Sequence, residues 1–189
     1  MKLFKNIKNW LENQEHLFYL FLFILIVPNM VLCFTEPLPF MAKVANVLLP
    51  FGCYYLLMTL SRNCGKMLWI LFLFLFFGAF QIVLLYLFGQ SIIAVDMFLN
   101  LATTNVTEAS ELLNNLWPAI ILVCVIYIPT IVIAAIGCKK RVHLTPVFRK
   151  KMACTGLIIG LVSYGLTFTA TNRNTGSYKL QYDAFPVNI

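Results

Sequence analysis

A polar stretch between two hydrophobic segments holds the side chains of this chain that are best suited to bind a ligand. Asp96, Asn100, Thr104 and Glu108 recur every four residues within residues 96–113, which contain three acidic residues and no Lys or Arg. On one continuous helix they would form a polar stripe that drifts by about 40° per step. A carboxylate attracts an ammonium group, and Asn and Thr can hydrogen-bond phosphate or ester oxygens. The stripe therefore predicts a site for a lipid head group that carries both an ammonium group and a phosphate.

The same residues also fit a purely structural interpretation. Asn105 followed by Glu108 is typical of a helix start, with Asn105 as the N-cap and the acid at the third position. Thr103 and Thr104 would then lie at a break between two helices. Apolar residues recur every three or four positions through 91–113, which predicts one or two amphipathic helices on the outer surface of the membrane. Glu108 can both start a helix and contact a ligand, so the two interpretations are compatible.

The composition indicates the class of protein that positions this stretch. Of 189 residues, 61% are hydrophobic and only 11% are charged, whereas soluble domains carry roughly 25% charged residues. Crossing a hydrocarbon core of about 30 Å needs ~20 helical residues. Five windows meet that length: 17–34, 42–60, 67–88, 117–138 and 152–170. We therefore predict an all-α integral membrane protein, with a five-helix transmembrane bundle in residues 1–171.

The distribution of Lys and Arg predicts the orientation of this bundle. With the N-terminus in the cytoplasm, eleven of the fourteen basic residues lie on the cytoplasmic side and three on the other. Cytoplasmic loops of membrane proteins carry such an excess. The polar stretch and the C-terminus then lie on the side opposite to the cytoplasm. This placement also accounts for the net charge of +7 without a nucleic-acid partner.

Two smaller patterns add to the architecture. Leu3, Phe4, Ile7, Trp10 and Leu11 have helical spacing with Lys on the opposite face, which predicts an N-terminal interfacial helix. Gly156 and Gly160 form a small-residue pair in the fifth span. Such pairs allow close helix approach, and packing within the bundle is favoured over dimerisation.

No metal site is expected in this chain. Its six Cys form no CxxC pair, and His16 and His143 lack an accompanying acid cluster. The centres of the spans carry no Asp, Glu, Lys or Arg, which argues against an ion pump.

The segment "TNVTEA", residues 104–109, is similar to the Thr-Asn-Pro-x-Glu-Ala string of bacterial phosphoethanolamine transferases that modify lipid A and confer polymyxin resistance. Asn100, Thr104 and Glu108 match that family's N-xxx-T-xxx-E pattern, while Val106 replaces its proline. The five predicted spans, the periplasmic helices between the third and fourth, and the tail "YKLQYDAFPVNI" also resemble the family.

The resemblance implies a function for the chain as a membrane domain. It also implies that the side opposite to the cytoplasm is the periplasm of a bacterial inner membrane. Residues 172–189 would start a periplasmic linker to a soluble catalytic domain with a Thr nucleophile and zinc, and this chain alone would be inactive. Phosphatidylethanolamine would be the donor, and lipid A or another glycolipid the acceptor. Asn100, Thr104 and Glu108 would line the lipid-substrate site.

Two other classes of function remain open. One is a small stand-alone channel or transporter, and the other is an assembly subunit whose periplasmic helix docks a partner protein. A transferase of the same fold that moves another phosphorylated head group is a third possibility.

Overall fold

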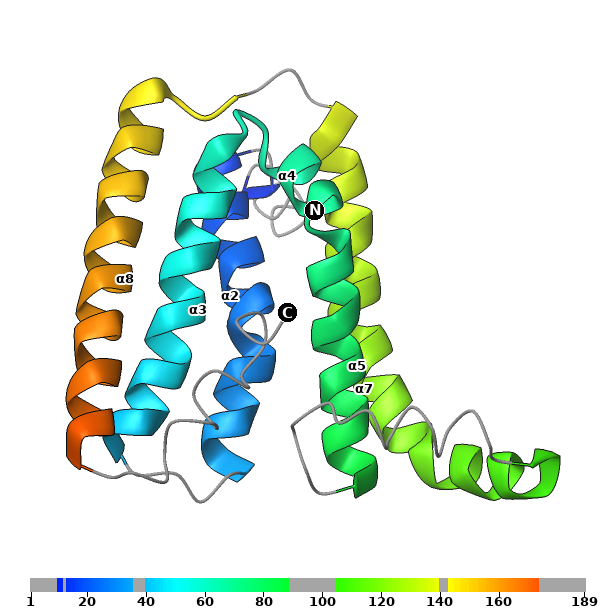
Figure 1. The fold of residues 1–189 in the computed structure, drawn as a ribbon. Helices are drawn as coiled ribbons and strands as arrows, with labels where there is room; N and C mark the ends of the chain where they lie inside the picture. The colour runs from blue at the N-terminus through cyan, green and yellow to red at the C-terminus, as the bar shows by residue number, and fades with distance from the viewer. Residues whose placement is uncertain (1–9, 12, 36–39, 89–104, 140–142, 174–189) are drawn as a thin grey trace.

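The computed structural model describes residues 10–11, 13–35, 40–88, 105–139 and 143–173, and helices occupy most of these ranges. No strand occurs within them. The helices, labelled in Figure 1, are α2 (Gln14–Thr35), α3 (Phe40–Leu60), α4 (Cys64–Ile70), α5 (Phe72–Phe88), α7 (Val106–Lys139) and α8 (Pro146–Arg173). The all-helical class is therefore confirmed for the part of the chain that is described. The predicted interfacial helix lies mostly outside it.

Three helical segments are long and apolar enough to cross a membrane: Gln14–Thr35, Lys43–Leu60 and Leu116–Lys139. They cover the first, second and fourth predicted spans. A fourth crossing follows if α4 and α5 are counted as one bent span. The fifth predicted span, 152–170, lies within α8. This helix is not among the three, and Arg149, Lys150 and Lys151 lie near its start.

The third predicted span, 67–88, is not one continuous helix. It is interrupted at Leu71, where α4 and α5 meet at 65°. No Gly or Pro marks this position, so the bend has another origin. A β-carbon on Gly65 would lie 2.5 Å from the carbonyl oxygen of Ala134. Helix α4 is therefore held close to the backbone of α7.

Helices α3 and α8 pack together along much of their length (Figure 1). A β-carbon on Gly52 would lie 2.8 Å from the backbone nitrogen of Gly160, and one on Gly156 would lie 2.8 Å from Cβ of Tyr55. No side chain fits at these points without displacing backbone or a neighbouring Cβ. The prediction that the glycine pair packs within the bundle is confirmed.

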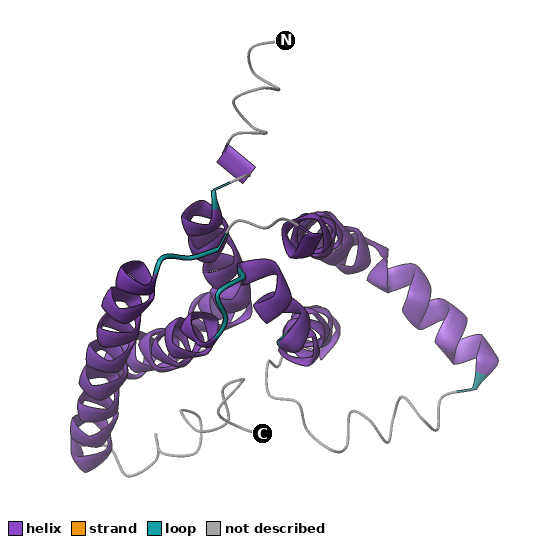
Figure 2. Ribbon diagram, turned by 90° about the horizontal axis from the view of Figure 1, so that it is seen from above, coloured by secondary structure: helices purple, strands orange, loops and turns teal. Residues whose placement is uncertain are grey.

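Helix α2 forms the centre of the bundle, with α3 on one side and α5 and α7 on the other (Figure 1 and Figure 2). Its side chains Leu17, Phe18 and Phe21 are fully buried. Phe18 makes edge-to-face contacts with Tyr55 of α3 and Phe148 of α8, at ring-centroid distances of 5.6 and 5.5 Å. These contacts join the chain's first and last described long helices near one end of the bundle.

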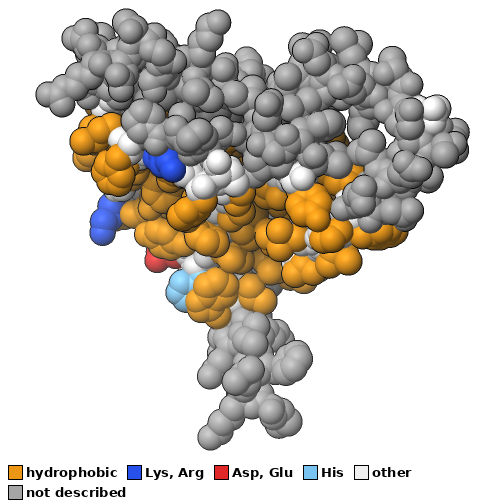
Figure 3. Space-filling view, turned by 90° about the horizontal axis from the view of Figure 1, so that it is seen from below, with side chains coloured by type: hydrophobic (Ala, Val, Ile, Leu, Met, Phe, Trp, Pro, Cys, Tyr) orange, Lys and Arg blue, Asp and Glu red, His pale blue; other side chains and the backbone are white. Residues whose placement is uncertain are grey.

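Large apolar side chains cover the outer faces of the helices. On α7 they recur at helical spacing and are all more than half exposed: Ile121, Val125, Ile128, Val132 and Ile136. Figure 3 shows that the described side chains on one side of the molecule are nearly all hydrophobic. Soluble proteins rarely expose apolar surface of this extent. Such surface is suited to contact with lipid acyl chains.

Candidate functional site

The described residues include only part of the predicted lipid site. Asp96, Asn100 and Thr104 lie outside them, so their arrangement stays a prediction. Glu108 is the third residue of α7, which begins at Val106 directly after Asn105. The helix start that the sequence pattern predicted at Asn105 is confirmed.

The helix that begins there is longer than expected. We predicted a surface helix after Asn105 and a separate span from 117, but α7 runs without interruption over 34 residues. Pro118 and Pro129 lie inside it, and proline is tolerated within membrane helices when neighbouring groups satisfy the freed carbonyls. Figure 1 shows that the first turns of α7 are turned away from the rest of the helix. Proline within a helix is the usual cause of such a bend.

Exposed basic residues are concentrated at one end of the bundle. The start of α7, with Glu108, lies at the opposite end together with the last turns of α2, α5 and α8 (Figure 1). The end with the basic residues, which we call the basic end, comprises the connections at 61–63 and 143–145 and the adjoining helix termini. Its exposed basic side chains are Arg62, Lys66, Lys139, Lys150 and Lys151.

One basic residue at this end has a structural role that the sequence did not indicate. Arg149, near the start of α8, donates hydrogen bonds to the carbonyl oxygens of Thr59 and Leu60, both at 2.9 Å. These carbonyls belong to the last turn of α3, which has no partners for them within the helix. Sequence reasoning gave Arg149 only a part in orientation, because its partners lie about ninety positions earlier in the chain.

At the same end of the bundle, hydrogen bonds made by buried polar side chains join α2, α4 and α7. Asn63 caps α4 by accepting from the backbone N–H of Lys66 at 3.1 Å, and its amide donates to the carbonyl of Gly137 at 3.1 Å. Gln14 accepts from the backbone N–H of Cys64 at 3.0 Å. An Asn before a helix was a readable signal for the cap. The two contacts between distant segments were not readable from the sequence.

Further polar side chains lie inside the bundle, midway along the helices. Asn29 of α2, Tyr54 of α3 and Tyr127 of α7 are buried, and their polar side-chain atoms have no hydrogen-bond partner in the described part of the chain. A β-carbon on Gly78 of α5 would lie 3.7 Å from the Tyr127 hydroxyl and 3.0 Å from the ring of Pro28. The Tyr127 hydroxyl and Pro28, the neighbour of Asn29 in α2, therefore both lie close to Gly78 of α5.

The sequence does not mark this interior set, because these residues are neutral and it is charged residues within spans that indicate a site. Buried amides and hydroxyls ordinarily have partners, which include ordered water. Three such groups are suited to hold water or a small neutral polar ligand. They could not stabilise an isolated charge as a carboxylate or ammonium would.

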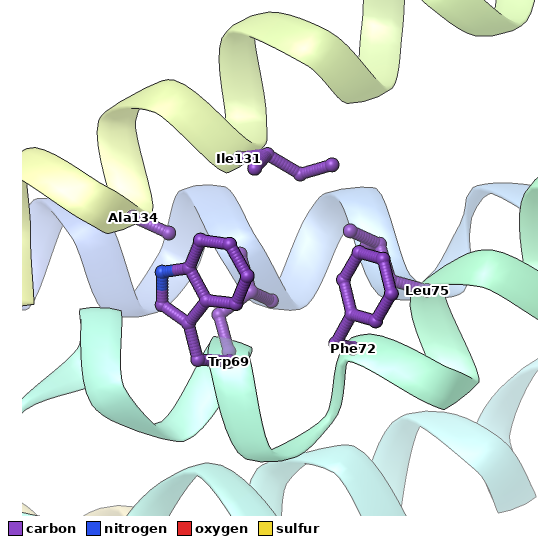
Figure 4. A pocket seen from close by; sticks show the side chains of 6 residues that line it. Trp69, Phe72, Leu75, Ile131 and Ala134 are labelled. Carbon is purple, nitrogen blue, oxygen red and sulfur yellow. The ribbon is translucent and has the colours of Figure 1, made fainter.

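A crevice opens where α4 and α5 meet, facing α7 (Figure 4). It is lined by Leu68, Trp69, Phe72, Leu75, Ile131 and Ala134. The rings of Trp69 and Phe72 point from α4 and α5 toward Ile131 and Ala134 on α7. All six side chains are apolar, so the crevice offers no group for chemistry.

Within the residues that the structure describes, no three His, Cys, Asp or Glu side chains are grouped to hold a metal ion. Comparison of the chain with protein-family models, curated proteins and solved structures found no match. The resemblance to phosphoethanolamine transferases therefore depends on the sequence motif and the helix pattern.

Proposed function

We propose that this chain is the membrane domain of a phosphoethanolamine transferase, which binds the phosphatidylethanolamine donor at the periplasmic surface. It also presents lipid A or another glycolipid acceptor to a soluble catalytic domain. The observation that carries the proposal is the spacing of Asn100, Thr104 and Glu108 in a stretch free of basic residues. A carboxylate can pair with the ammonium of the donor head group, and the Asn and Thr side chains can hydrogen-bond its phosphate.

The start of α7 supports this role for Glu108. An acidic side chain in the first helical turn is stabilised by the positive end of the helix dipole. The same turn begins at the end of the bundle opposite to the basic end. A carboxylate there meets the ammonium of a lipid on the side of the membrane that carries few basic residues.

The proposed topology has five crossings. We count α4 and α5 as one bent span and α8 as the fifth, with the basic end in the cytoplasm and the N-terminal segment as an interfacial helix. The excess of exposed Lys and Arg at the basic end supports this orientation in a bacterial inner membrane.

The chemistry that follows is a two-step transfer in the complete enzyme. A Thr oxygen of the catalytic domain forms a bond to the donor phosphorus, the bond to the glycerol oxygen breaks, and diacylglycerol leaves with a proton. An acceptor oxygen on the glycolipid then attacks the same phosphorus and releases the Thr. Zinc in the catalytic domain would activate the nucleophile. In this scheme the present chain holds and orients the donor.

The test measures donor binding by the chain itself. In nanodiscs of mixed phosphatidylethanolamine and phosphatidylcholine, native mass spectrometry should detect preferential retention of phosphatidylethanolamine. The triple variant Asn100→Ala, Thr104→Ala, Glu108→Gln should lose this preference. Glu15→Gln removes an acid at the opposite end and serves as the matched control. Equal retention of both lipids by the unaltered chain would refute the donor site.

A second candidate function follows from the interior polar set. Asn29, Tyr54 and Tyr127 are buried polar groups inside a bundle of apolar helices, as expected of a small transporter or channel for a neutral polar solute. A flux assay with glycerol or urea on reconstituted protein tests it. Flux that Asn29→Leu abolishes would favour this function over the transferase.

A further inference from the structure

Helices α4 and α7 cross at the basic end with almost no space between their backbones. A β-carbon on Gly65 of α4 would lie 2.7 Å from the backbone nitrogen of Cys138 in α7, and one on Gly137 would lie 3.7 Å from Cα of Gly65. Lys66 follows the first of these contact points in the chain, and Lys139 follows the second. Backbone packing therefore keeps the chain at Lys66 close to the chain at Lys139.

The side chains that flank this crossing carry charges of the same sign. Lys66 and Lys139 are both exposed, and the charge of Lys66 acts on the thiol of Cys138, the residue before Lys139. Arg62 is a third exposed cation, and its neighbour Asn63 hydrogen-bonds the backbone of α7 at 3.1 Å. Helix α4 contains no Asp or Glu, and the acidic residues of α7 lie in its first two turns, at the other end of the bundle.

The acidic residue of α2 offsets only part of this charge. Glu15 is the one acidic residue of α2, and its neighbour Gln14 accepts a hydrogen bond from the backbone N–H of Cys64 at the start of α4. A single carboxylate neutralises at most one of the three cations. Like charges that are held close together repel each other, and a bound anion relieves this repulsion.

Exposed tryptophans show which kind of anion meets the three cations. Trp69 lies one turn after Lys66 in α4 and is 45% exposed, and Trp10, before the start of α2, is 42% exposed. Tryptophan is enriched where membrane helices pass from the hydrocarbon core into the head groups. Ile70, next to Trp69, is 70% exposed, and apolar surface beside the cations fits a lipid partner better than an acidic soluble protein. An anionic leaflet attracts basic residues that lie at its surface.

We propose that Arg62, Lys66 and Lys139 bind the head group of an anionic phospholipid at the membrane surface, where α4 crosses α7. The acyl chains of this lipid stay in the surrounding bilayer, so no cavity in the bundle is required. The site does not depend on the transferase function, because Glu108 lies at the other end of the bundle and the proposed donor is zwitterionic. The two proposals can fail separately.

Native mass spectrometry of the full chain, released from nanodiscs, tests this site. The discs contain equal amounts of phosphatidylglycerol, which is anionic, and phosphatidylcholine, which is zwitterionic. They contain no phosphatidylethanolamine, so the proposed donor site does not contribute. We expect phosphatidylglycerol to be retained about fivefold more than phosphatidylcholine, which corresponds to the attraction of roughly one basic residue to an anionic membrane surface.

Three double variants separate this site from general surface charge. Lys66→Gln with Lys139→Gln should bring the ratio of the two retained lipids close to one, whereas Lys66→Arg with Lys139→Arg keeps both charges and should leave the ratio unchanged. The matched pair Lys150→Gln with Lys151→Gln removes two exposed charges from α8, which lies on the other side of the bundle at the same end (Figure 1). This pair should also leave the ratio unchanged.

Two results would overturn the proposal. The first is equal retention of both lipids by the unaltered chain, which would favour an acidic protein as the partner of these cations. The second is an equal loss of preference in the two glutamine pairs, because the preference would then follow the total charge of the basic end and not the crossing of α4 and α7. All four lysines are exposed, so equal unfolding temperatures should confirm that each variant is folded.

Discussion

Glu108 has two roles in our account, at the start of α7 and at the donor head group, and two substitutions distinguish them. Glu108→Ala removes both the carboxylate and the polar group at the third helical position. Glu108→Gln keeps an amide that can still complete the cap. A role limited to the helix start predicts that Ala lowers the free energy of unfolding by about 1 kcal/mol and that Gln changes it little.

The donor role predicts a different pattern for the same pair. Both substitutions should lower transferase activity by at least tenfold when the chain is joined to the proposed catalytic domain, at equal protein levels in the membrane. Activity is measured as transfer from phosphatidylethanolamine to a lipid A acceptor. Full activity of both variants would reject the donor role while leaving the helix start intact.

Asn29 lies on α2 with 0% exposure and with no partner for its amide among the described residues. A buried amide without hydrogen bonds costs about 1–3 kcal/mol. Replacement by Leu, which has nearly the same shape, should therefore raise the free energy of unfolding by a similar amount. Thermal unfolding in detergent micelles measures the change.

The opposite result at Asn29 would also be informative. A loss of more than about 1 kcal/mol would mean that the amide is hydrogen-bonded in the folded protein, through water or a bound solute. That outcome would contradict the expected stabilisation and strengthen the second candidate function.

At the scale of helices, the α3–α8 contact depends on the absence of side chains at Gly52 and Gly156. A valine at position 52 would place its Cβ 2.8 Å from the backbone nitrogen of Gly160. Backbone cannot move aside as a flexible side chain can, so the helices must separate. We expect Gly52→Val to lower the free energy of unfolding by about 2–3 kcal/mol.

Gly165 of α8 provides the control. A β-carbon there meets nothing within 4 Å, and alanine favours a helix over glycine by roughly 0.5–1 kcal/mol. Gly165→Ala should therefore be neutral or slightly stabilising in the same unfolding measurement. Equal losses at positions 52 and 165 would show that the close α3–α8 approach is absent in the folded protein.

The helices could be predicted well, but their bends and contacts could not. Runs of apolar residues gave the helical segments, and Asn105 marked the start of α7. The bend at Leu71 was not readable, because no Gly or Pro marks it. The close approach of Gly65 to Ala134 was not readable either, since it joins residues about seventy positions apart. The capping of α3 by Arg149 was hidden for the same reason. The proposed site was readable from the sequence only as a spacing of residue types. It stays a prediction, since Asn100 and Thr104 lie outside the described residues.

For the whole molecule, the number of crossings decides where the two ends of the chain lie. If α8 crosses the membrane, five spans place the termini on opposite sides, whereas four place them together. We expect a reporter fused after Ile189 to be active as alkaline phosphatase and dark as green fluorescent protein, because the latter does not fold when exported through the general secretion pathway. The reverse result would contradict the proposed orientation or the fifth crossing.

The packing of α8 has a consequence for how the protein is made. Its long contact is with α3, and its other described contacts are side chains near its start, where Tyr19 of α2 donates to the sulfur of Met152 at 3.4 Å. The helices before it can therefore assemble as they leave the ribosome, without waiting for the last one. Biogenesis would then end when the newest helix closes against a partner that was inserted more than eighty residues earlier.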